Sequence, residues 1–155
     1  MIGHELVHAF QFDITGQGQS VVGFRVPTAT RLPLWFIEGM AEYLSLGPVD
    51  AHTAMWLWDA LERNGLPAMK DLDDPKYFPY RYGQAFWAFL AGHYGDQVVG
   101  QVLKAAGRSG DVGRALLNVT GMKVDSLSSL WHGDVEAAYT PLRGRQSLPG
   151  HTAGC

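Results

Sequence analysis

Two histidines and a glutamate stand close together in the segment HELVH at residues 4–8. On a helix, His4 and His8 lie one turn apart on the same face, so both imidazoles can bind a single metal ion. Glu5 directly follows His4 and points to the side of the pair, where a carboxylate can accept a proton from a water on the metal. Zinc lowers the pKa of such a water to about 7. These residues therefore predict a zinc site suited to hydrolysis, with Glu5 as general base and acid.

A catalytic zinc site normally has three protein ligands, and the third could be His or Glu. Residues 9–19 contain no histidine, which excludes a third His soon after the motif. On the next predicted helix, Glu38 and Glu42 lie one turn apart among apolar residues, where acids need partners. We expect Glu38 to bind the zinc and Glu42 to accept a ring N–H from a histidine ligand.

The segments HELVHAFQ and LPLWFIEGMAEYLS resemble the gluzincin pattern of the peptidase MA-like families, HExxH followed by WxxEGxAEY. A later aromatic segment, YRYGQAFWAFLAGHYGD, and a Leu127…Trp131 pattern are also similar, so the resemblance covers roughly residues 2–140. It implies a zincin-like metallopeptidase that hydrolyses peptide or protein substrates, with Zn²⁺ on His4, His8 and Glu38.

The resemblance has three further implications. A tyrosine near the substrate carbonyl would stabilise the oxyanion, with Tyr82 as the first candidate and Tyr80 as the second. The protein would work outside the cytoplasm, either periplasmic or secreted. The family's β-sheet before the motif has no counterpart here, so we expect a chain truncated at its N-terminus that binds zinc but hydrolyses peptides poorly. Two alternatives stay open, a silent metal-binding or interaction module and a helical scaffold without metal.

The composition indicates one globular domain. The 155 residues include 46% hydrophobic and 17% charged residues, and the net charge of −3 gives no sign of a nucleic-acid partner. No apolar run is long enough to span a membrane, and the single cysteine, Cys155, cannot form an internal disulfide. We expect the domain to cover residues 1–140, with a disordered tail at 141–155. The five tryptophans are expected in the core.

Hydrophobic periodicity and turn residues predict a mainly α fold of about seven helices with very little sheet. One short strand is expected near residues 21–26. Aspartates are expected to cap three helices, at Asp50, Asp96 and Asp111, and Asp125 or Ser126 is expected to cap the last. The predicted helices span residues 2–12, 32–47, 51–65, 80–95, 96–110, 112–121 and 126–139.

Overall fold

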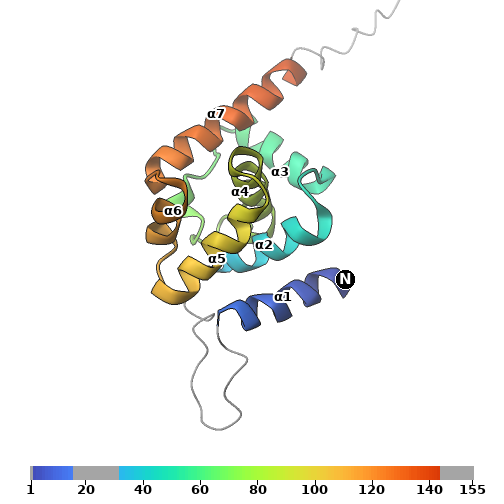
Figure 1. Ribbon diagram of the computed structural model, residues 1–155. Helices are drawn as coiled ribbons and strands as arrows, with labels where there is room; N and C mark the ends of the chain where they lie inside the picture. Colours follow the sequence, from blue (N-terminus) through green and yellow to red (C-terminus); the bar gives the residue numbers. More distant parts are fainter. Residues whose placement is uncertain (1, 16–31, 144–155) are drawn as a thin grey trace, which may run out of the picture.

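The computed structural model describes residues 2–15 and 32–143, which form seven α-helices with no strand among them (Figure 1). The predicted mainly α class is confirmed. The strand predicted at residues 21–26 and the tail from residue 144 onward lie outside the described residues. None of the helices in the described ranges is long and apolar enough to cross a membrane. The helices are α1 (Ile2–Ile14), α2 (Leu34–Leu46), α3 (Ala51–Glu62), α4 (Pro79–Tyr94), α5 (Gln97–Ser109), α6 (Val112–Thr120) and α7 (Val124–Arg143), with a short 3-10 helix η2 (Met69–Asp71) between α3 and α4.

Two of the predicted helix caps are confirmed. The Asp50 carboxylate accepts the backbone N–H of Thr53 at 2.9 Å, and Asp111 accepts that of Arg114 at 2.9 Å. Each bond satisfies an N–H that has no partner within its own helix. The sequence therefore sets the starts of α3 and α6 locally.

The other two cap predictions are confirmed only in part or not at all. Asp96 occupies the N-cap position of α5, as predicted, but it has helical backbone angles and its side chain makes no capping bond. Its carboxylate accepts the Tyr43 hydroxyl at 3.3 Å. The last helix begins at Val124, so Asp125 and Ser126 lie inside its first turn. It also continues to Arg143, past the predicted domain end at residue 140.

Helices α2 and α4 cross at a pair of glycines. A Cβ on Gly39 would lie 2.4 Å from the Gly83 backbone, and one on Gly83 would lie 2.3 Å from the Trp35 carbonyl oxygen. Only hydrogen fits at either position. Near the same crossing, the buried indole of Trp87 donates to the Phe36 carbonyl at 3.0 Å. This close contact fixes the position of α2, which carries Glu38 and Glu42, against α4.

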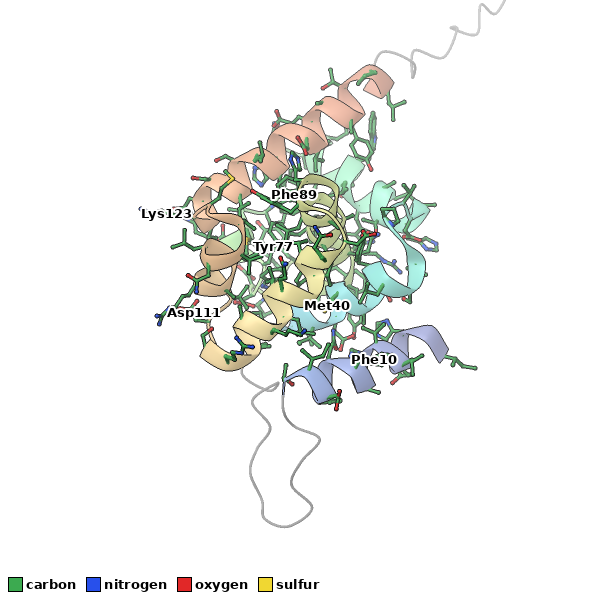
Figure 2. The ribbon with its side chains drawn as sticks, in the orientation of Figure 1. Phe10, Met40, Tyr77, Phe89, Asp111 and Lys123 are labelled. Atoms are coloured by element: carbon green, nitrogen blue, oxygen red, sulfur yellow. The ribbon has the colours of Figure 1, made fainter. Side chains whose placement is uncertain are left out.

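The core lies around α4, which runs through the middle of the molecule (Figure 1). Side chains including Met40 and Phe89 fill the space between the helices (Figure 2). Trp56 departs from the prediction that all tryptophans are core, because 42% of its surface is exposed, and Trp58 is only partly buried. The three buried tryptophans are Trp35, Trp87 and Trp131.

Candidate metal centre

Gln11 fixes α1 on the surface of α2. It is the only buried residue of α1, and its side-chain amide donates to the Ile37 carbonyl of α2 at 2.9 Å. The amide oxygen of Gln11 faces the other way and lies 2.8 Å from Nδ1 of His8. The two bonds together set the orientation of the His8 ring.

The same contact selects the tautomer of His8. The Gln11 Oε1 atom can only accept a hydrogen bond, so Nδ1 of His8 must carry the proton. In the neutral ring, Nε2 then keeps a free lone pair, which is what a metal ligand requires. This Nε2 lies 3.4 Å from Oε2 of Glu38.

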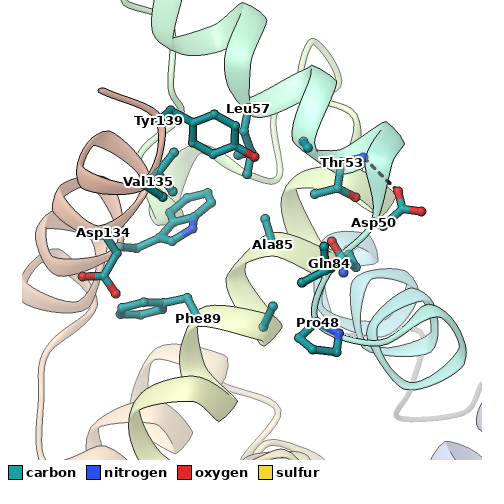
Figure 3. A pocket seen from close by; sticks show the side chains of 15 residues that line it. Pro48, Asp50, Thr53, Leu57, Gln84, Ala85, Phe89, Asp134, Val135 and Tyr139 are labelled. Atoms are coloured by element: carbon teal, nitrogen blue, oxygen red, sulfur yellow. Dashed lines mark hydrogen bonds between the residues drawn. The ribbon is translucent and has the colours of Figure 1, made fainter. Parts of the chain in front are cut away.

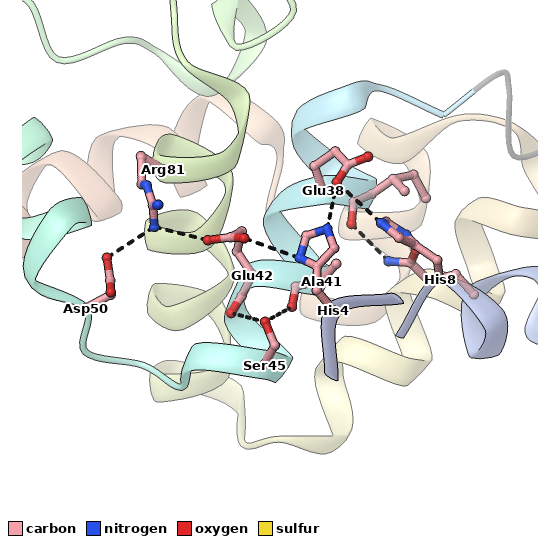
Figure 4. A network of polar contacts seen from close by, with 10 residues as sticks. His4, His8, Glu38, Ala41, Glu42, Ser45, Asp50 and Arg81 are labelled. Atoms are coloured by element: carbon pink, nitrogen blue, oxygen red, sulfur yellow. Dashed lines mark hydrogen bonds and ion pairs between the residues drawn. The ribbon is translucent and has the colours of Figure 1, made fainter. Parts of the chain in front are cut away.

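His4 lies between two carboxylates of α2 (Figure 4). Its Nε2 is 3.1 Å from Oε2 of Glu38, and its Nδ1 is 3.2 Å from Oε1 of Glu42. The second contact has ion-pair distance but not the geometry of a hydrogen bond, and Nδ1 is otherwise buried without a hydrogen-bond partner among the described residues. The two histidine rings meet edge to face, with centroids 4.8 Å apart.

The donor set of His4, His8 and Glu38 fits a zinc ion. One ligand atom from each lies within 4.8 Å of the other two. Tetrahedral ligands at zinc bond lengths lie roughly 3.3 Å apart, close to the two distances from Glu38 to the histidines. The three side chains and that of Glu42 are between 16% and 19% exposed, so the cluster is shielded but reachable from solvent. Two imidazoles and one carboxylate leave a fourth position for water or substrate.

A chain of charges continues from the cluster toward α3. The second oxygen of Glu42, Oε2, accepts from Arg81 at 3.0 Å, and the same guanidinium nitrogen lies 3.2 Å from Oδ2 of Asp50 (Figure 4). The pKa of Asp50 is lowered, first by the backbone N–H of Thr53 and then by Arg81. Glu42 is therefore held between a histidine and an arginine, which keeps its carboxylate directed at His4.

Tyr80, rather than Tyr82, lies beside the cluster. The Tyr80 ring stacks on His4 with centroids 6.3 Å apart and an interplanar angle of 25°. Its pKa is raised by burial and by the nearby Glu38 and Glu42 carboxylates, so the phenol remains a hydrogen-bond donor across neutral pH. Tyr82 is 5% exposed and packs against Trp56 and Tyr77, so the structure does not bring the first-ranked tyrosine to the histidines.

Glu5 lies on α1 next to His4, and its side chain is exposed. Within the described residues no hydrogen bond or ion pair engages its carboxylate, so it is available to solvent. The remaining described histidines play no part in the cluster: His93 pairs with Asp134 at 2.6 Å, His132 contacts the Pro67 carbonyl at 2.7 Å and His52 is exposed.

Two residues of the centre are missing from the sequence prediction. Gln11 stands three residues after His8 and so on the same helix face, which is a signal that could have identified it. Arg81 reaches Glu42 across 39 positions, and nothing local in the sequence indicates that contact.

Comparisons with protein-family models, with curated proteins and with solved structures found no match. The residues of the cluster therefore carry the functional proposal.

Proposed function

We propose that this protein is a zinc-dependent peptidase of the gluzincin type with a zincin-like helical domain. The observation that carries the proposal is the convergence of one ligand atom each from His4, His8 and Glu38 within 4.8 Å of one another, beside a Glu5 that has no partner among the described residues. His8 supports it further, because Gln11 leaves Nε2 of His8 with its lone pair free. The substrate class we propose is a peptide or protein.

Zinc held by the three ligands would supply Lewis acidity, which makes a water acidic at neutral pH and polarises the scissile carbonyl. Other side chains of the site would orient the histidine ligands. Glu42, with Oε1 3.2 Å from Nδ1 of His4, would accept a hydrogen bond from that N–H after a small reorientation, keeping the ring fixed and basic, while Arg81 would hold Glu42 in place. Gln11 would do the same for His8.

Glu5 would move the proton. Its carboxylate would take a proton from the attacking water as the water oxygen forms a bond to the carbonyl carbon. The same proton would then pass to the amide nitrogen as the C–N bond breaks, giving a free acid and a free amine. Tyr80 would donate its phenol proton in a hydrogen bond to the oxyanion.

The test compares wild type with Glu5→Gln on a broad peptide library, using new N-termini as the readout, with and without a chelator. We expect wild type to cleave peptides only with zinc. Glu5→Gln should bind zinc with unchanged affinity while cleavage falls at least 100-fold, since general-base groups contribute about 10²–10⁴ in rate. Equal cleavage by the two proteins would overturn the proposed role of Glu5. Zinc binding without any cleavage would favour a silent metal-binding module instead.

A further inference from the structure

Three aromatic side chains form a continuous row that ends at the candidate metal centre. The ring centroid of Trp56 lies 5.3 Å from that of Phe78, and the centroid of Phe78 lies 5.4 Å from that of Tyr80. Tyr80 in turn stacks on His4 at 6.3 Å. Trp56 and Phe78 are 42% and 39% exposed. The aromatic row of Trp56, Phe78 and Tyr80 therefore offers apolar surface to solvent beside a histidine of the metal centre.

Helix α3 carries Trp56 on a different face from the residues that line its hollow. Leu57, the next residue, lines the hollow between α3, α4 and α7 (Figure 3). One position along a helix is a rotation of about 100°, so Trp56 points in a different direction. Its ring contacts Phe78 and Tyr82. The exposed surface of Trp56 therefore belongs to the row that leads to His4.

Phe78 stands at a position where a polar residue would stabilise the helix. It is the N-cap of α4, and its side chain makes no capping bond, whereas Ser, Thr, Asp or Asn would pair a backbone N–H there. Pro79 follows and restricts Phe78 to extended backbone angles, with φ at −75° and ψ at 107°. An exposed aromatic side chain in place of a cap is expected where function, not local stability, selects the residue.

The charges beside the row favour a neutral ligand. Asp59 lies one turn after Trp56 on α3 and already accepts from Arg63 at 2.9 Å. Asp50, the cap of α3, lies 3.2 Å from Arg81. A positively charged side chain on the row would therefore find both of these carboxylates paired. A large apolar side chain would gain from covering the exposed rings.

We propose that the aromatic row binds a large apolar side chain of the peptide substrate, so that the enzyme prefers peptides with such a residue near the scissile bond. This inference rests on the proposed peptidase function. Neighbouring ring centroids from His4 to Trp56 are between 5.3 and 6.3 Å apart. An extended peptide rises about 3.3 Å per residue, so the row reaches at most about five residues from the metal centre.

The first measurement needs neither zinc nor cleavage. N-acetyl-phenylalaninamide and its lysine and alanine counterparts are titrated into ¹⁵N-labelled protein without added zinc, and the indole N–H resonances are followed by NMR. We expect the phenylalanine compound to shift the Trp56 resonance, assigned with Trp56→Phe, and to bind roughly fivefold more tightly than either counterpart. The resonance of the buried Trp87 should not move. No shift of Trp56, or equal binding of the three compounds, would overturn the proposal.

The second measurement compares cleavage of zinc-loaded protein's substrates that differ at one position only. Peptides carry Phe, Lys or Ala at that position, which is moved along the peptide. At one position or more, wild type should show a kcat/KM roughly tenfold higher for Phe than for Lys or Ala. Phe78→Ala and Trp56→Ala should lose this preference. Leu117→Ala, at a 41% exposed residue on α6, is the matched control and should keep it.

The outcomes separate this inference from the proposed function. The preference is a ratio within one protein, so a partly unfolded variant still reports it. Cleavage without a preference for Phe, or a preference that survives in the row variants that fold, would overturn the role of the aromatic row and leave the peptidase standing. No cleavage of any peptide by zinc-loaded wild type would overturn the peptidase, and a Trp56 shift in that protein would still support an apolar binding site at the row.

Discussion

Helices α1 and α4 both contribute to the candidate metal centre, yet they are held in the molecule by different means. Helix α4 buries nine residues and crosses α2 with its backbone in direct contact at Gly83. Helix α1 buries one, Gln11. Several large apolar residues of α1 are instead exposed, namely Ile2, Leu6, Phe10, Phe12 and Ile14.

The difference indicates how each half of the centre is positioned. Hydrophobic burial fixes Glu38 and Glu42 through the α2–α4 crossing, independently of any ligand. His4 and His8 are fixed mainly by polar contacts, those of Gln11 and of the two glutamates. A metal ion shared by both halves would therefore stabilise the docking of α1 far more than it would stabilise the core.

The largest loss of stability is expected from a substitution at the glycine crossing of α2 and α4. Gly39→Ala places a Cβ 2.4 Å from the Gly83 backbone, so the helices must separate. We expect the free energy of unfolding to fall by about 3 kcal/mol, with loss of zinc affinity because Glu38 moves. Urea denaturation measures the change.

Gly92→Ala is the control for that substitution, because Gly92 lies on α4 with no atom within 4 Å of an added Cβ. It should stabilise the protein by about 0.5–1 kcal/mol, as alanine usually does in a helix. Similar effects of the two substitutions would show that α2 and α4 can accommodate a methyl group at their crossing.

The next largest effect is a change in kcat that should distinguish Tyr80 from Tyr82. Tyr80→Phe should lower kcat about 10²-fold at unchanged zinc content, since it removes an oxyanion donor. Tyr82→Phe should leave kcat unchanged, because that ring packs on Trp56 and Tyr77 instead. Because the pKa of Tyr80 is raised, its ionisation should not reduce the rate until the pH exceeds about 10. A larger loss with Tyr82→Phe would reverse the assignment.

A smaller effect, on zinc affinity, tests the polar contacts that attach α1 to α2. Gln11→Leu removes the acceptor of the His8 N–H and the bond to Ile37, so His8 loses its fixed tautomer. Zinc affinity should fall roughly tenfold to 100-fold in a chelator competition, as for other groups that orient a ligand. Gln101→Leu, an exposed position on α5, is the control and should bind zinc normally. Normal zinc binding by Gln11→Leu would mean that His8 needs no orienting contact.

The smallest effect is a change in stability expected at Asp50, the last residue of the charge chain that runs from Glu42 through Arg81. Asp50→Ala should cost about 1 kcal/mol of unfolding free energy at neutral pH through the lost cap of α3. The folded-state pKa of Asp50 is lowered, so its contribution is fully present above the ordinary value of about 3.9 and is lost as the pH falls through the lower folded value. Denaturation at neutral pH and near pH 3 should therefore show a shrinking difference from wild type.

Asp111→Ala serves as the comparison, since Asp111 caps α6 in the same way. We expect it to cost less than Asp50→Ala, because only Asp50 also contacts Arg81. The opposite order would show that the contact between Asp50 and Arg81 does not stabilise the fold.

The features that follow from local rules could be predicted from the sequence. The period of apolar residues predicts the helices, and capping chemistry predicts Asp50 and Asp111 correctly. Helical spacing also predicts that His4 and His8 share one face and that Glu38 and Glu42 share another. That these two faces meet was expected only from the resemblance to the gluzincin pattern. Features set by contacts between residues far apart in the sequence could not be predicted. Asp96 bonds Tyr43 across 53 positions, and whether Tyr80 or Tyr82 faces His4 depends on how α4 is rotated at Gly83.

All of these assignments depend on the proposal that His4, His8 and Glu38 bind one zinc ion. Zinc binding at equilibrium, measured by competition with a coloured chelator, tests it directly in wild type, His8→Gln and Glu38→Gln. The control is His93→Gln, because His93 pairs with Asp134 and takes no part in the cluster. We expect one tightly bound zinc in wild type and in His93→Gln, with affinity reduced at least 100-fold in the other two variants. Undiminished binding after loss of His8 or Glu38, or no binding by wild type, would contradict it.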